Sequence, residues 1–359
     1  MNQGCTKTHK PTKKVYFCDG AVKGKIVALL EQHYELILTN KDPDYIFYSC
    51  MGFEHLNYNK VRIFATGENL RADFNFCDYA IGYDYIHFED RYLRYPLYLH
   101  CESDMQKAMN KHLHITPETL QNKSRFCTFV VSNGKADEIR TQFFDFLSQY
   151  NRVDSGGRYK NNIGNPVVDK YAFLKEGKFN IAFENSSTNG YITEKLIQAF
   201  AAHTIPIYWG DERISLPLDK MGGGINPKSF INMHKYESYK EVLETIYFLD
   251  THDEAYLSML SEPVFLDKNH QKIFDEKLEN FLLHIFNQPL EKAYRRGFGQ
   301  WRCNIEKRYK KAQKARQIVN NFANIFQIPL RTLKKYLLSI YLSATSKSFV
   351  FFTKERTSK

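Results

Sequence analysis

The segment from Lys178 to Gly210 constrains the fold of this chain more than any other. It reads KFNIAFENSSTNGYITEKLIQAFAAHTIPIYWG: a short apolar run, a polar loop, a helix-forming stretch and a second apolar run. This order predicts a parallel βαβ unit, with strands over Phe179–Phe183 and Ile205–Trp209 and a helix over Thr193–Ala202. Because ligands of open α/β sheets bind beyond the carboxyl ends of the strands, the loop before the helix is the candidate binding site.

This loop and the first helical turn carry polar side chains that suit a nucleotide: Glu184, Asn185, Tyr191, Glu194 and Lys195. A carboxylate can hold ribose hydroxyls, an amine can pair with phosphate, and a helix N-terminus favours negative charge. The residues therefore indicate a nucleotide or phosphosugar site. They also allow a structural loop whose polar residues only cap the helix, with Thr193 as the N-cap.

The same segment resembles the signature of glycosyltransferase family 10, the α-1,3/4-fucosyltransferases. The signature motifs stand here as Phe183–Ser186 (FENS), Gly190–Lys195 (GYITEK), Pro206–Gly210 (PIYWG) and Ile225–Asn232 (INPKSFIN). Three upstream motifs look like those of bacterial members: Ala65–Leu70 (ATGENL), Cys77–Asp84 (CDYAIGYD) and Arg91–Tyr98 (RYLRYPLY). Several long motifs in the family's order are far more specific than one short pattern.

The resemblance implies an α/β protein with the GT-B glycosyltransferase fold, in which two Rossmann-like domains face each other across a cleft. Strand candidates alternate with helix candidates, as this fold requires. The expected strands are Val15–Asp19, Tyr34–Leu38, Tyr45–Ser49, Arg62–Phe64 and Phe126–Val131. The expected helices are Ile26–Gln32, Ala136–Tyr150, Ser238–Leu249 and Leu278–Phe286. We expect a disordered leader (residues 1–13), an acceptor domain (14–122), a GDP-fucose-binding domain (123–300) and a basic amphipathic tail (301–359).

The resemblance further implies an inverting α-1,3-fucosyltransferase. Such an enzyme moves L-fucose from GDP-β-L-fucose to a hydroxyl of an acceptor glycan that contains GlcNAc or galactoside, such as lipopolysaccharide or a similar surface glycan. Inversion occurs in one displacement, so one carboxylate suffices as the base. Two alternatives stay open: the same fold with another GDP-sugar or with α-1,4 linkage, and a non-catalytic, membrane-associated nucleotide- or glycan-binding protein.

The catalytic residues implied by the resemblance come from both domains. Glu68, in ATGENL, is the expected base; otherwise it caps a helix or pairs with Arg71. Lys195 and Arg140 are the expected cations at the departing diphosphate, where charge-assisted hydrogen bonds would hold them. The alternative for Arg140 is a surface cation on a helix.

The donor contacts implied by the resemblance are Glu194, at the ribose, together with Tyr191 and Asn185. Glu184 either touches the nucleotide or orients the loop. We expect no essential metal and no cofactor, because Arg and Lys take the metal's place in this fold. The pattern Asp42-Pro43-Asp44 matches a metal-binding D-x-D, but it reads as an ordinary turn.

The net charge of +10 belongs to the carboxyl-terminal tail. Residues 301–359 contain 14 Lys or Arg and 2 acidic residues, whereas the rest of the chain holds 36 basic and 38 acidic residues. Basic amphipathic helices bind anionic membranes, which we expect here; otherwise the tail packs back on the catalytic domains. We expect no nucleic-acid partner, because no recognisable module is present.

The chain carries seven scattered Cys, and its amino terminus shows neither a signal peptide nor an apolar anchor. We therefore expect a cytoplasmic protein, held peripherally at the inner face of the cytoplasmic membrane.

Overall fold

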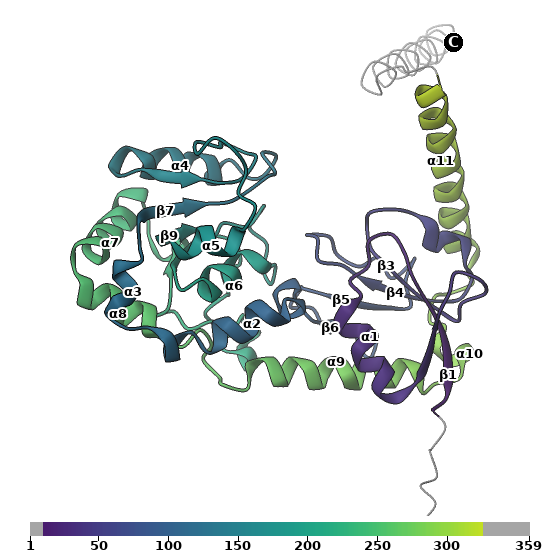
Figure 1. The fold of residues 1–359 in the computed structure, drawn as a ribbon. Coiled ribbons are helices and arrows are strands. Elements are labelled where there is room, and N and C mark those ends of the chain that lie inside the picture. Colours follow the sequence, from purple (N-terminus) through teal and green to yellow (C-terminus); the bar gives the residue numbers. More distant parts are fainter. Residues whose placement is uncertain (1–9, 326–359) are drawn as a thin grey trace, which may run out of the picture. The chain divides into compact units, whose positions relative to one another are not determined.

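Two parallel β-sheets dominate the computed structural model, which describes residues 10–325 (Figure 1). The chain forms two compact units, one ending at Arg296 and one beginning at Gly297. Both sheets belong to the first unit, where each is the centre of one lobe. The leader predicted over residues 1–13 falls mostly, and the tail beyond residue 325 entirely, outside the described residues.

The first lobe is built on a six-stranded sheet with the order β2-β1-β3-β4-β5-β6, in which all neighbours are parallel. Its strands are β1 (Thr12–Phe17), β2 (Glu35–Leu38), β3 (Tyr45–Tyr48), β4 (Val61–Ala65), β5 (Tyr79–Gly82) and β6 (Tyr92–Arg94). The order reverses between β1 and β3, since β2 lies on one side of β1 and the later strands on the other. Loops at the carboxyl ends of strands beside such a reversal open into a crevice.

The second lobe holds a five-stranded parallel sheet with the order β11-β10-β9-β7-β8. Its strands are β7 (Arg125–Phe129), β8 (Val153–Ser155), β9 (Gly177–Ile181), β10 (Ile205–Tyr208) and β11 (Ile231–Asn232). Here the order reverses between β7 and β9. The helices of this lobe are α4 (Ile139–Tyr150), α5 (Lys170–Lys175), α6 (Glu194–Ala201), α7 (Tyr239–Thr251) and α8 (Asp253–Ser261).

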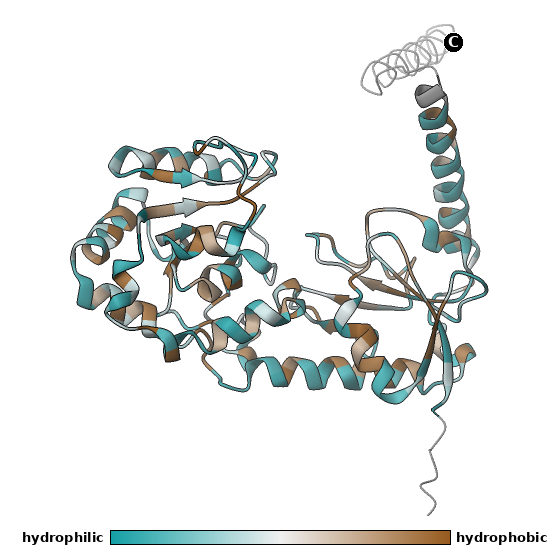
Figure 2. Cartoon of the chain, viewed as in Figure 1, coloured by the Kyte–Doolittle hydropathy of each residue, from teal (hydrophilic) through white to brown (hydrophobic). Residues whose placement is uncertain are grey.

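The strands carry mostly hydrophobic residues, whereas the helices are mixed (Figure 2). All residues of β3, β4, β5 and β10 are buried. Parallel strands covered on both faces have this continuous apolar character. Helix α6 instead buries one face, through Leu196, Ile197 and Phe200, as an amphipathic helix against a sheet does.

The chain returns from the second lobe to the first through α9 (His270–Phe286) and α10 (Leu290–Ala293). Phe286 stacks on Tyr45 of β3 with 4.0 Å between the ring centroids. Helix α9 also faces α1 (Gly24–His33) of the first lobe, where the Lys25 ammonium lies 2.8 Å from the Asp275 carboxylate. Residues far along the chain therefore close the core of the first lobe.

A buried ion pair fixes the end of this returning segment. The Arg296 guanidinium lies 2.7 Å from the Asp78 carboxylate, and neither side chain is exposed. Asp78 also accepts hydrogen bonds from the backbone N–H groups of Arg62, Arg295 and Arg296, each at 2.7 Å. A buried carboxylate needs such pairing to be tolerated.

The first connection between the lobes carries two short helices. They are α2 (Glu102–Met109) and α3 (Glu118–Gln121), which lie between β6 and β7 in the sequence. Helix α2 contacts α6, and the Gln198 amide donates to Asp104 at 3.1 Å. The linker is thereby packed on the second lobe before β7 begins.

The predicted α/β architecture with two Rossmann-like lobes is confirmed, and each strand and helix expected from the sequence appears in the structure. Some bounds differ. Strand β1 begins at Thr12, inside the segment expected to be a leader. Helix α4 begins at Ile139 and not at Ala136, because the Asp137 backbone N–H donates to the Asn185 carbonyl at 2.9 Å and holds the preceding residues as a loop.

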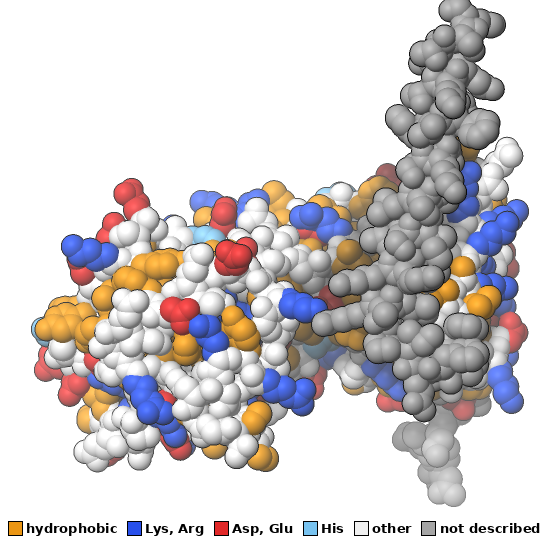
Figure 3. All heavy atoms as spheres, turned by 90° about the horizontal axis from the view of Figure 1, so that it is seen from above, with side chains coloured by type: hydrophobic (Ala, Val, Ile, Leu, Met, Phe, Trp, Pro, Cys, Tyr) orange, Lys and Arg blue, Asp and Glu red, His pale blue; other side chains and the backbone are white. Residues whose placement is uncertain are grey.

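Acidic and basic side chains are interspersed over the visible face of the molecule (Figure 3). This mixture agrees with the near balance of charge before residue 301. Such a surface creates no large field of one sign.

The second unit is described up to Ile325 and consists mainly of α11 (Gln300–Ile325). Within this helix Glu306 pairs with Arg302 at 2.7 Å and with Lys310 at 3.2 Å. Trp301 and Ile318 are exposed along the helix. Among residues 10–325, no helix combines the length and the apolar character needed to cross a membrane.

Candidate functional site: a cleft between two crevices

The carboxyl ends of the strands of both lobes open into one cleft of about 630 Å³. Its first-lobe wall consists of residues that follow β3 and β4: Cys50, Met51, Glu68, Asn69 and Leu70. Its second-lobe wall comes from loops after β7 and β9: Asn133, Lys135, Ala136, Asp137, Asn185, Ser186 and Tyr191. These second-lobe loops flank the reversal of strand order, where an open α/β sheet binds its ligand.

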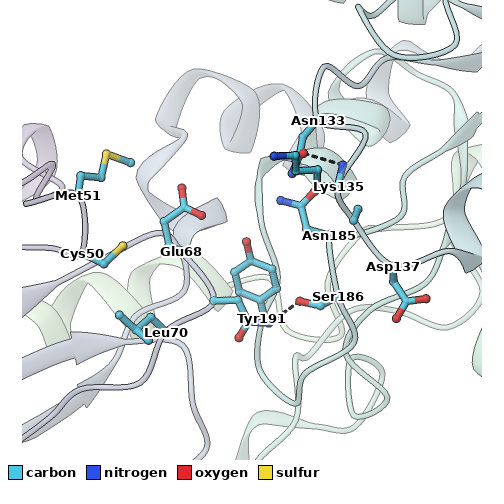
Figure 4. A pocket seen from close by; sticks show the side chains of 12 residues that line it. Cys50, Met51, Glu68, Leu70, Asn133, Lys135, Asp137, Asn185, Ser186 and Tyr191 are labelled. Carbon is cyan, nitrogen blue, oxygen red and sulfur yellow. Dashed lines mark hydrogen bonds between the residues drawn. The ribbon is translucent and has the colours of Figure 1, made fainter. Parts of the chain in front are cut away.

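Three of the predicted site residues meet in this cleft. Figure 4 shows Glu68 on one side and Asn185 and Tyr191 on the other, with the Glu68 carboxylate and the Tyr191 hydroxyl pointing into the space between them. Tyr191 is almost fully buried, and burial, followed by the nearby Glu184 and Glu68 carboxylates, raises the pKa of its hydroxyl. The tyrosine therefore stays protonated and can donate a hydrogen bond.

Glu68 lies in the loop after β4, and its side chain is exposed. The backbone holds the residue in place, because its N–H donates to Thr66 Oγ1 at 3.1 Å and its carbonyl accepts from the Leu70 N–H at 2.7 Å. Both structural alternatives for Glu68 are wrong. Residues 66–78, all of them described, form no helix, and Arg71 pairs with Asp84 at 3.0 Å.

Glu184 organises the loop of the βαβ unit. It is fully buried, and its two carboxylate oxygens accept hydrogen bonds from the Thr193 N–H and the Thr193 hydroxyl, each at 2.7 Å. Thr193 does occupy the N-cap position of α6, but its hydroxyl donates to Glu184 and does not cap a helix N–H. Of the two roles considered for Glu184, the geometry favours loop orientation.

Lys195 and Glu194 begin α6 and form a charged network with Glu184. The Lys195 ammonium lies 3.3 Å from Glu184, 3.4 Å from Glu194 and 2.9 Å from the Thr193 hydroxyl. Burial opposes the charge on Lys195, but the two carboxylates outweigh it and raise its pKa. Burial likewise opposes the charge on Glu194, yet Lys195, the helix backbone and Lys170 lower its pKa. Both groups are therefore ionised at neutral pH.

Arg140 lies in the first turn of α4 and is buried, so the surface-cation alternative is wrong. Its Nη1 donates to Asn185 Oδ1 at 2.9 Å, and its Nη2 donates to the Asn133 carbonyl. Burial lowers its pKa, but a guanidinium remains charged in proteins. Arg140 thus stands directly behind two residues that line the cleft.

As far as the described residues define it, the lining of the cleft does not include Arg140, Glu194 or Lys195. Lys195 instead lines a separate cavity of about 10 Å³, together with Lys170 and Asn180. A space of this size holds at most one water molecule. Arg140 therefore lies one contact behind the open cleft, through Asn185 and Asn133, whereas Lys195 pairs with Glu184, Glu194 and Thr193, which do not line it.

Sequence analysis did not select Lys170, Asn69 or Lys135, and the structure places Asn69 and Lys135 in the cleft and Lys170 beside Lys195. Lys170, at the start of α5, donates to Gln198 at 2.6 Å and shares the small cavity with Lys195. Lys135 and Asn69 line the cleft itself. Since the three residues belong to segments far apart in the sequence, only the packing of the chain brings them near the predicted residues. Within the described ranges, no group of three or more His, Cys, Asp or Glu side chains could hold a metal ion.

This arrangement places an exposed carboxylate across the cleft from polar residues that the Arg140 guanidinium holds from behind. Two Rossmann-like lobes with such a cleft at the carboxyl ends of their strands define the GT-B class of glycosyltransferase. Residues 13–101 match the family described as Alpha-(1,3)-fucosyltransferase FucT N-terminal domain, and residues 120–325 match Glycosyltransferase family 10 (fucosyltransferase) C-term. The chain therefore belongs to glycosyltransferase family 10.

Among curated proteins, the chain is similar to Alpha-(1,3)-fucosyltransferase FucT of Helicobacter pylori. The two are 38% identical over 269 residues, which cover 65% of this chain and 55% of the relative. It is also 33% identical over 145 residues to a bovine 3-galactosyl-N-acetylglucosaminide 4-alpha-L-fucosyltransferase, covering 39% of this chain and 38% of that protein. The chain thus spans about half the length of the bacterial relative and a smaller share of the bovine one.

A solved structure described as an alpha1,3-fucosyltransferase with GDP-fucose superposes on this chain with a TM-score of 0.62. The two are 30% identical, and the match covers 79% of this chain and 93% of that structure. The same enzyme type solved with GDP gives a TM-score of 0.61 over 78% of this chain and 93% of that structure. The likeness extends over both lobes and confirms the GT-B fold.

Proposed function

We propose that this protein is an inverting fucosyltransferase that moves L-fucose from GDP-β-L-fucose to a hydroxyl of an acceptor glycan in α-1,3 linkage. The observation that carries this proposal is the position of Glu68 across the cleft from Asn185 and Tyr191. Family membership and similarity to enzymes named as α-1,3-fucosyltransferases support the donor and the linkage.

Glu68 is the proposed general base. An acceptor hydroxyl in the cleft would transfer its proton to the carboxylate as the oxygen attacks C1 of fucose. The new C1–O bond forms on the face opposite the bond to phosphate, which breaks and leaves its electron pair on GDP. An exposed carboxylate that no described residue pairs with suits this role, since it can approach the acceptor and release the proton to water.

The second lobe is the proposed donor side. Glu194 would hold the ribose, Tyr191 and Asn185 would contact the donor, and Lys195 and Arg140 would stabilise the departing diphosphate. The pairing of Lys195 with two carboxylates and the contact of Arg140 with Asn185 support fixed positions for both cations. We propose that these cations replace a divalent metal, so that transfer needs neither a metal nor a cofactor.

The acceptor is proposed to be a glycan containing GlcNAc or galactoside, such as the lipopolysaccharide of the producing cell. Exposed apolar residues on the basic helix α11 support an anionic membrane surface as a further partner, and the cytoplasmic face of the membrane as the location. Removing residues 331–359 should shift the protein from membrane to soluble fractions and leave activity on a soluble acceptor intact. Loss of that activity in a folded truncation would contradict a purely membrane-binding tail.

A donor panel tests the function directly. GDP or UDP release should be measured from GDP-fucose, GDP-mannose and UDP-galactose, with and without N-acetyllactosamine, in the presence of EDTA. We expect release from GDP-fucose alone, stimulated by the acceptor. Release from another donor would replace the proposed substrate, and a dependence on added metal would refute metal independence.

Two further readouts separate the remaining alternatives. Linkage analysis of the product distinguishes α-1,3 from α-1,4 transfer, and its anomeric configuration tests inversion. Calorimetric titration of GDP identifies a non-catalytic binding protein, which would bind the nucleotide but release none from any donor across a panel of acceptors.

A further inference from the structure

The side chain of Asn69 spans the seam between the two lobes. Its Nδ2 donates to Ser186 Oγ at 2.6 Å and to Thr188 Oγ1 at 2.8 Å, both in the second lobe. Its Oδ1 accepts from the Tyr83 hydroxyl, in the first lobe, at 2.5 Å. The amide therefore makes three hydrogen bonds, two of which cross the seam.

The surroundings of Asn69 leave little space for a different arrangement. Gly190, with a φ of +88°, approaches the Tyr83 carbonyl so closely that a Cβ on the glycine would lie 2.3 Å from that oxygen. The Tyr83 and Tyr191 rings pack edge to face with 5.3 Å between centroids. The loop over residues 184–190 is thus seated directly on the first lobe.

Asn69 and its partner Ser186 are each the sequence neighbour of a proposed functional residue. Asn69 follows Glu68, the proposed base, and its partner Ser186 follows Asn185, which Arg140 holds. One side chain therefore connects the loop that carries the base with the loop that carries the proposed donor contacts.

We propose that Asn69 is a positioning residue that fixes Glu68 relative to the donor-binding loop. The inference rests on the proposed function and deepens it. The amide does not act on the reacting atoms. It holds the two walls of the cleft in register, so that a hydroxyl activated by Glu68 faces the donor. A displacement of about 1 Å in such a geometry can cost on the order of a hundredfold in rate.

The variant Asn69→Ala should lower kcat for transfer by about ten- to a hundredfold and leave the Kd for GDP within about twofold. The variant Ser186→Ala/Thr188→Val removes the same contacts from the opposite lobe and should give the same split. Combining Asn69→Ala with Ser186→Ala/Thr188→Val should lower kcat little more than either variant alone. The effects of substitutions that remove the same contact are not additive.

The matched control is Tyr85→Phe. The Tyr85 hydroxyl donates to Asp211 at 2.7 Å, which is another hydrogen bond between the lobes, but Tyr85 does not neighbour Glu68 in the sequence. This variant should keep kcat within about threefold of wild type, because the remaining seam contacts hold Glu68 in place.

The experiment measures kcat, the Kd for GDP and the free energy of unfolding for all of these variants. The proposal is overturned by unchanged kcat in Asn69→Ala, by additive losses in the combined variant, or by an equal loss in Tyr85→Phe. A wild-type protein without fucosyl transfer would refute the proposed function instead. In that case the free energies of unfolding still show whether Asn69 interacts with Ser186 and Thr188. Additive losses of this free energy in the combined variant would overturn the inference.

Discussion

The two lobes differ in how the charged groups of the candidate site are held. In the second lobe, behind the lining of the cleft, Glu184, Lys195 and Arg140 are buried or nearly so, and each has at least two polar partners. On the first-lobe wall, Glu68 is exposed, and only its backbone is tied to the loop in the part of the chain that the structure describes. The predicted cations of the second lobe are thus held by several contacts each, whereas the proposed base stays accessible.

The strongest challenge to this comparison is Glu68→Gln. The amide keeps the size of the side chain but cannot take a proton, so we expect transfer to fall by about 10²- to 10⁴-fold. Calorimetry should show an unchanged Kd for GDP. The control is Glu31→Gln, at an exposed glutamate of α1, which should transfer at the wild-type rate. Wild-type transfer by Glu68→Gln would remove the base from the proposal.

Lys195→Ala tests the buried charged groups of the second lobe. We expect the affinity for GDP to fall by about ten- to a hundredfold, the worth of a charge-assisted hydrogen bond. The transfer rate should fall with it, and Lys175→Ala, at an exposed position of α5, should change neither. Unchanged donor affinity in Lys195→Ala would mean that the network around Glu184 is structural only.

Glu184→Gln measures how much the network contributes to the fold. Gln retains one acceptor for the Thr193 N–H but leaves the Lys195 ammonium without its buried carboxylate partner. We expect the free energy of unfolding to drop by about 1–3 kcal/mol in urea titrations at pH 7. An increase would indicate that the buried charge of Glu184 costs more than its contacts return.

The smallest expected effect is the pH dependence of GDP binding. The pKa of Glu194 is lowered and that of Lys195 is raised, so both groups remain ionised throughout the neutral and mildly alkaline range. The Kd for GDP should therefore vary by less than about twofold between pH 7 and pH 9. A steep change of the Kd between pH 7 and pH 9 would show that a group at the donor site changes its protonation state in that range.

The sequence predicts most of the fold because its strands and helices carry clear patterns. The runs Tyr45–Ser49 and Phe126–Val131 are apolar and bounded by polar turns, and β3 and β7 form there. Four strands were not predicted: β5, with four residues, and β6, β8 and β11, whose two or three residues are too few to show a period. The domain boundaries expected at residues 122 and 300 stay predictions, although α9 and Arg296 pack on the first lobe.

The candidate site, like the fold, could be predicted only in part. Glu68, Asn185 and Tyr191 were chosen from motifs, and the structure brings them to one cleft. The contacts that hold them, such as Arg140 to Asn185 or Asn69 to Ser186, join residues 45 and 117 positions apart in the sequence. Only the packing of loops from two sheets determines such pairs, so no local pattern predicts them.

The return of the chain through α9 has a consequence for biosynthesis. One core cluster of the second lobe consists of buried residues from Cys127 to Leu260 and can form once that segment has been made. The first lobe leaves the ribosome earlier, yet Tyr45 lacks its stacking partner until Phe286 emerges, and Asp78 lacks its counter-charge until Arg296 does. Domains commonly fold in the order of their synthesis. Here the lobe that is translated first gains these core contacts only when α9 and Arg296 have been made.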